Sequence, residues 1–95
     1  MQYSNDISTK IDDSILILNQ MIENAKSQGA QNFDMLHTLA EALKDLQIKV
    51  ANKQKVDRGF TVKWDNVMGW VPKVFEDHPL LDLLRHIDAE IMASQ

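Results

Sequence analysis

The chain has 95 residues, of which 44% are hydrophobic and 25% charged, and its formal net charge is −4. This is the composition of an ordinary globular protein, so we expect residues 1–95 to form a single domain. There is no apolar run of about 18 residues, as a membrane span would need, and the lack of cysteine excludes disulfides and zinc–thiolate sites. The N-terminus has no basic segment followed by an apolar one, as a signal peptide would have, so we expect a cytoplasmic protein.

Charge is distributed unevenly along the chain. Residues 1–48 hold three basic and seven acidic side chains, residues 49–73 hold six and two, and residues 74–95 hold one and five. A basic middle segment can complement the acidic ends within the fold, or it can bind an anionic partner. We expect internal complementarity and keep binding to an anionic partner as the alternative.

The first predicted helix runs from about Asp6 to Ala25. Ser4 or Asn5 can cap its N-terminus, and Gly29 lies just beyond its end. Its apolar residues recur at spacings of three and four, as expected for one face of a helix; they are Ile7, Ile11, Ile15, Leu18, Ile22 and Ala25.

The second predicted helix runs from about Phe33 to Ala51, with Asn32 as its cap. It carries a heptad pattern of apolar residues, formed by Leu36, Leu39, Leu43, Leu46 and Val50. The helix could continue beyond Ala51, with Gly59 as a plausible terminator. Two amphipathic helices joined by a short glycine-containing break predict an antiparallel helical hairpin.

The middle segment is ambiguous. Apolar and polar residues alternate from Phe60 to Trp64, which is typical of a strand. Alternatively, Asp65 or Asn66 could cap a short helix, although Pro72 argues against a regular uninterrupted one. We expect an extended piece over residues 60–64 and then a short broken helix.

The last predicted helix begins at Pro79, with Asp77 or His78 as its cap, and continues to near the C-terminus. Its apolar stripe contains Leu80, Leu84, Ile87 and Ile91. The predicted fold class is therefore all-α: a helical hairpin, an irregular connector that carries both tryptophans, and a C-terminal helix that completes a small bundle.

Catalytic and metal-binding patterns are weak. His78, Asp82 and His86 are spaced four residues apart and could form one edge of a metal site. No further ligands of a recognised motif accompany them, so we interpret them as a solvated helix face. The sequence has no nucleophile elbow, phosphate-binding loop, dinucleotide fingerprint or EF-hand loop. We therefore predict no enzymatic activity, cofactor or metal.

An apolar run points to a protein partner. Residues 15–18 are Ile-Leu-Ile-Leu, so this part of the first helix is apolar on every side and must be covered on every side. Large side chains in the middle segment could plug the hairpin or contact a partner. The predicted partner-binding residues are Leu16, Ile17, Trp64, Met68 and Trp70.

The sequence thus favours a non-enzymatic protein-binding module, such as a small cytosolic adaptor, inhibitor or antitoxin-like regulator. Because a lone hairpin leaves its apolar seams half covered, we also expect a homodimer. The alternative is a nucleic-acid-binding regulator, because basic residues interleaved with aromatics can bind phosphates and bases. Its candidate residues are Lys49, Lys53, Lys55, Arg58 and Lys63.

Overall fold

The computed structural model describes residues 5–28, 33–54, 56 and 58–93. This part of the chain forms four helices and no strand: α1 (Asn5–Gln28), α2 (Phe33–Ala51), α3 (Arg58–Val74) and α4 (Pro79–Ala93). The predicted all-α fold is confirmed, and α2 has the predicted bounds. None of these helices is both long and apolar enough to cross a membrane. The predicted cap residues Ser4 and Asn32, and Gly29, lie outside the described residues.

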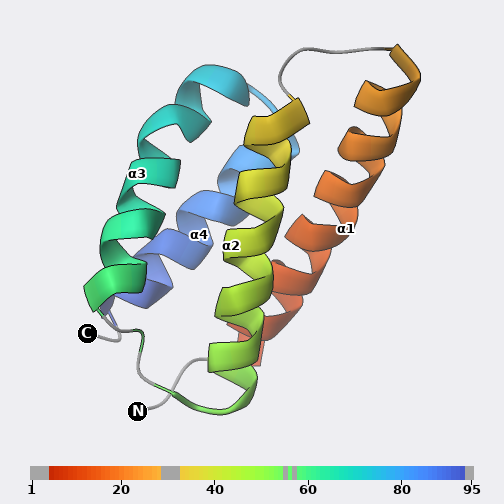
Figure 1. Cartoon of the computed structure of the whole chain (residues 1–95). Coiled ribbons are helices and arrows are strands. Elements are labelled where there is room, and N and C mark those ends of the chain that lie inside the picture. Colours follow the sequence, from red (N-terminus) through yellow and green to blue (C-terminus); the bar gives the residue numbers. More distant parts are fainter. Residues whose placement is uncertain (1–4, 29–32, 55, 57, 94–95) are drawn as a thin grey trace.

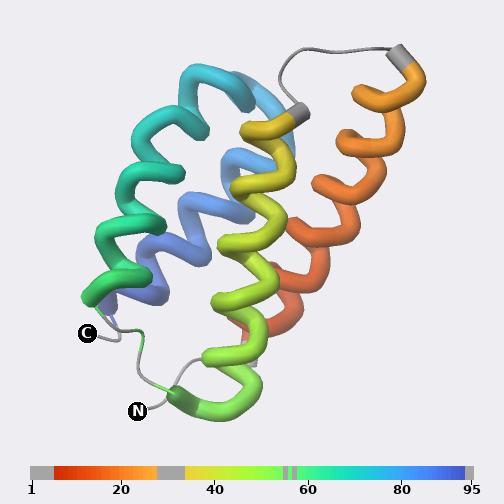
Figure 2. The backbone as a smooth tube through the Cα atoms, viewed as in Figure 1, coloured from red at the N-terminus to blue at the C-terminus, as the bar shows by residue number. Residues whose placement is uncertain are grey.

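Successive helices run in alternating directions (Figures 1 and 2). α1 packs against α2 and α4, and α2 also contacts α3. The side chains of Trp64 on α3 and Asp88 on α4 are hydrogen-bonded, which joins the last pair of helices. α1 and α3 therefore lie at opposite edges of the bundle and run in the same general direction, as Figure 1 shows.

The core lies between the four helices. Both predicted seams of the hairpin contribute to it, as do the apolar stripe of α4 and two aromatic side chains from the middle of the chain. The largest fully buried side chains are Ile7, Ile11, Leu18, Leu39, Leu43, Leu46, Trp64, Phe75, Leu80, Leu84, Ile87 and Ile91. The bundle thus covers its own hairpin seams within one chain.

The prediction of an extended piece at 60–64 is wrong, because these residues lie in α3. Phe60 and Trp64 are four residues apart, so they share a face of a helix as readily as a face of a strand. Both are buried, whereas Val62 is exposed. A strand would place Val62 on their side, so its exposure is what distinguishes the helix.

The helical face of α3 continues beyond Trp64 through Val67 and Val71, which are also buried. Pro72 does not break the helix, contrary to prediction. Pro72 cannot donate to the Met68 carbonyl, but only Lys73 and Val74 follow it, so α3 ends within one turn of this lost hydrogen bond.

α2 ends at Ala51, well before the predicted terminator Gly59. Gln54 N–H donates to the Lys49 carbonyl (2.8 Å) and Lys53 N–H to the Val50 carbonyl (3.1 Å). This is the hydrogen-bond pattern of a Schellman motif, whose left-handed position is usually glycine. Lys53 occupies that position here, with a φ of 56°.

The start of α4 follows the sequence prediction. Pro79 is its first residue, and the His78 Nδ1 atom accepts a hydrogen bond from the Leu80 N–H at 3.1 Å. His78 is therefore the cap of α4. Asp77, the other candidate, has a φ of 62° and forms the preceding turn.

Candidate protein-binding surface

The apolar run of α1 is divided between the core, two helix interfaces and solvent. Leu18 is fully buried, and Ile15 and Ile17 are half-buried and packed against the core. Leu16 is 59% exposed. Because a helix turns by about 100° per residue, Leu16 lies about 200° from Leu18, on the outer face of α1.

The two flanking isoleucines are directed toward neighbouring helices. Ile15 is seven residues from Ile22, which lines a hollow of about 270 Å³ between α1 and α2. Ile17 is seven residues from Lys10, which lines a hollow of about 140 Å³ between α1 and α4. Residues seven apart share a helix face, so α2 and α4 cover the two sides of the run. Only Leu16 remains for a partner.

Trp64 belongs to the core and is not available to a partner. Its side chain is 1% exposed, and its indole Nε1 donates to Asp88 Oδ1 at 2.8 Å. The Phe60 ring stacks beside it, with ring centroids 6.2 Å apart. The placement of Trp64 among the partner-binding residues is therefore corrected: it is the core plug that the sequence offered as the other interpretation.

Met68 and Trp70 are half-buried and pack against the core. They are two residues apart and therefore lie about 200° apart around α3, on opposite flanks. The Trp70 ring lies beside the Phe75 ring, with centroids 6.2 Å apart. The five predicted contact residues thus do not form one surface.

The described residues of the predicted basic surface also do not lie together on one face. The Lys49 ammonium lies over the Phe60 ring, 5.9 Å from its centroid, in a cation–π contact between α2 and α3. Arg58 and Lys63 are exposed but lie about 140° apart around α3. Lys53 is exposed in the turn after α2, and Lys55 lies outside the described residues.

The histidine pattern on α4 forms no metal site. His78 caps the helix through Nδ1, and its ring lies 6.0 Å from the Phe75 ring between centroids. Asp82 lines an open hollow beside His78, whereas His86 lines the hollow between α1 and α4. Within the described ranges no three His, Asp or Glu side chains are placed to hold a metal ion.

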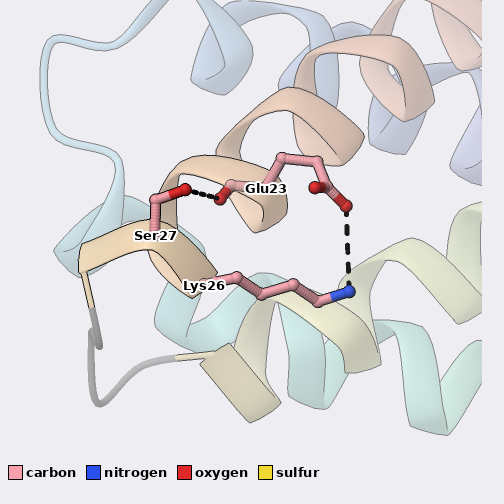
Figure 3. Close-up of polar contacts among 3 residues, drawn as sticks. All are labelled: Glu23, Lys26 and Ser27. Atoms are coloured by element: carbon pink, nitrogen blue, oxygen red, sulfur yellow. Dashed lines mark hydrogen bonds and ion pairs between the residues drawn. The ribbon is translucent and has the colours of Figure 1, made fainter.

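Short-range polar contacts dominate the end of α1. The Lys26 ammonium lies 3.7 Å from a Glu23 carboxylate oxygen, and Ser27 Oγ donates to the Glu23 carbonyl at 3.2 Å; Figure 3 draws both contacts. Nearer the start of the helix, Asp12 accepts a hydrogen bond from the Gln47 amide of α2. These contacts hold surface side chains of α1 in place without burying their charges.

Two features were missed at the sequence level. Ser14 is fully buried in the seam of α1, where its hydroxyl donates to the Lys10 carbonyl at 2.8 Å; its heptad position between Ile11 and Leu18 could have indicated this. Two exposed aliphatic side chains were also missed: Ile48 lies opposite the seam of α2, where helix geometry could have placed it, and Val62 was assigned to an extended piece.

No protein-family model, curated protein or solved structure matches this chain. Its function has to be inferred from its own residues.

Proposed function

We propose that this chain is a non-enzymatic protein-binding module that associates with itself. The observation that carries the proposal is Leu16, a large aliphatic side chain that is 59% exposed in the middle of α1. Its neighbours on the outer face of α1 are polar or acidic, so it is an apolar point within a hydrated helix surface. Fully burying an exposed leucine contributes roughly 1.5–3 kcal/mol. Covering the exposed part of Leu16 contributes less but still favours association.

The hollows on the bundle favour a binding role over a catalytic one. The three hollows described above are open, and the one beside His78 measures about 370 Å³. Typical small-molecule sites instead enclose their ligand between largely apolar walls. We therefore regard the bundle as a scaffold that presents side chains on its outer faces.

The test is the mass of the protein in solution, measured by light scattering coupled to size exclusion. We expect the wild type to exceed the monomer mass of 10.9 kDa at micromolar concentration. Leu16→Glu should give a helical monomer, because the side chain lies outside the core. Ile48→Glu is the matched control: Ile48 is 58% exposed on α2, and its substitution should leave the mass unchanged.

A wild-type mass of 10.9 kDa across the micromolar range would contradict self-association. Only Leu16 is substituted in this test. Ile17 is half-buried, so its substitution could weaken the fold as well as the contact between copies, and the two effects could not be separated. Submicromolar, steeply salt-dependent binding to oligonucleotides would instead favour the nucleic-acid alternative, since such binding is driven by phosphate contacts.

A further inference from the structure

α3 differs in charge from the other helices. It carries three basic side chains and one acidic side chain, a balance of +2. α1 carries four acidic and two basic side chains, a balance of −2. The two helices occupy opposite edges of the bundle, so neither covers the outer face of the other (Figure 1). The molecule therefore has an acidic edge and a basic edge.

Each edge has one large aliphatic side chain that is more than half exposed. On α1 this is Leu16, and Asp12, Asp13 and Glu23 lie within about 60° of it around the helix. We call these four residues the acidic face. Glu23 is partly compensated by Lys26, whereas neither aspartate has an ion pair among the described contacts.

On α3 the corresponding side chain is Val62, which is 54% exposed. Arg58 and Lys73 lie within about 40° of it around the helix, and all three residues are exposed. We call these three residues the basic face. Asp65 lies at its border, about 60° from Val62, and Lys63 flanks the other side.

From these placements we infer that two copies of the chain associate head to tail, with the acidic face of one copy on the basic face of the next. This rests on the proposed self-association and specifies its geometry. With Leu16 opposite Val62 and the helices parallel, Arg58 lies at the height of Asp12 along the helix axis and on the side of the contact where Asp13 lies, so it can reach this pair of aspartates. Glu23 then lies near Lys73.

The fold favours this arrangement. α1 and α3 run in the same general direction at opposite edges of one bundle (Figures 1 and 2). A simple translation by the width of the bundle therefore brings α1 of one copy parallel to α3 of the next. Such a contact leaves one acidic and one basic face free at the two ends, so it can recruit further copies.

A symmetric contact through Leu16 is less favourable. A two-fold axis near Leu16 would place the acidic face of one copy against the same face of the other. Asp12, Asp13 and Glu23 would then meet like charges, and like-charge contacts oppose association. In the head-to-tail contact, the acidic face instead meets the opposite charge of the basic face.

The test is charge reversal on each face, followed by mixing. One variant carries Asp12→Lys and Asp13→Lys, and the other carries Arg58→Glu and Lys73→Glu. Each alone should be monomeric at micromolar concentration, because its altered face meets a like charge. An equimolar mixture should regain a higher mass, because the unaltered faces of the two variants form the wild-type contact and their two altered faces are also complementary. Circular dichroism checks that each variant remains helical.

The wild-type mass should also rise with concentration beyond twice 10.9 kDa, and Val62→Glu should abolish association as Leu16→Glu does. A mass that stops at the dimer and is unaffected by both Val62→Glu and Arg58→Glu/Lys73→Glu would overturn the head-to-tail contact, while self-association would stand. A wild-type protein that is monomeric throughout would overturn both proposals.

Discussion

α2 and α3 pack in the same bundle, but their local sequences favour a helix to very different degrees. α2 carries an uninterrupted heptad seam, and its bounds follow from the sequence. α3 begins with a segment rich in β-branched and aromatic residues, contains a glycine and ends around a proline. Its local sequence disfavours a helix, yet it forms one.

The difference shows where the stability of each helix originates. In α2, the local sequence favours a helix and the tertiary packing favours the same helix. α3 depends on burying one face, formed by Phe60, Trp64, Val67 and Val71. Most helical stability in proteins comes from such packing and not from propensity, so a short, unfavourable sequence can be helical when its face is covered.

Trp64→Ala tests this dependence most strongly. We expect it to lower the free energy of unfolding by about 3–5 kcal/mol, because it empties the largest space in the core and leaves Asp88 without its indole donor. Urea denaturation followed by circular dichroism measures the loss. A change below about 1 kcal/mol would show that α3 is not held by Trp64.

Leu43→Ala makes the corresponding change in α2. Leu43 is fully buried, so we expect a loss of about 2–5 kcal/mol in the same urea experiment. Because α2 has a strong local preference for the helix, we expect the Leu43 variant to keep its helical content at urea concentrations where the Trp64 variant has already lost structure. Equal loss of helix in both variants would remove the distinction between the two helices.

Gly69→Ala should produce the smallest change, and in the opposite direction. Gly69 is exposed within α3, and an added Cβ would meet nothing within 4 Å. We expect the variant to be more stable by about 0.5–1 kcal/mol, because alanine loses less backbone entropy in a helix. Ala89→Gly, at an exposed position in α4, is the matched control and should destabilise by a similar amount. Destabilisation by Gly69→Ala would show that α3 needs its glycine.

The sequence predicted the regular part of the fold because local and tertiary signals coincide there. The seam of α2 and the cap of α4 at Pro79 each follow from residues close together in the chain. The helix at 60–64 could not be settled from a short window, since Phe60 and Trp64 suit both periodicities. Joined with Val67 and Val71, the same residues form one helical stripe.

The candidate surface was less predictable. Leu16 is exposed opposite the seam of α1, a position that helix geometry determines from the sequence alone. Trp64 was misplaced because a tryptophan in an ambiguous segment suits a core or a surface equally well. Its partner Asp88 lies 24 residues away along the chain, and only the packing of α4 against α3 brings the carboxylate to the indole.

The unequal burial of the two tryptophans gives the protein a pair of built-in optical probes. Trp64 is enclosed and hydrogen-bonded to a carboxylate, whereas Trp70 is half-buried beside Phe75 near the end of α3. Their fluorescence should respond to different events: Trp64 to loosening of the whole interior, Trp70 to fraying of one helix end. With Trp70→Phe, the emission of the single remaining indole would follow the interior alone, without any added label.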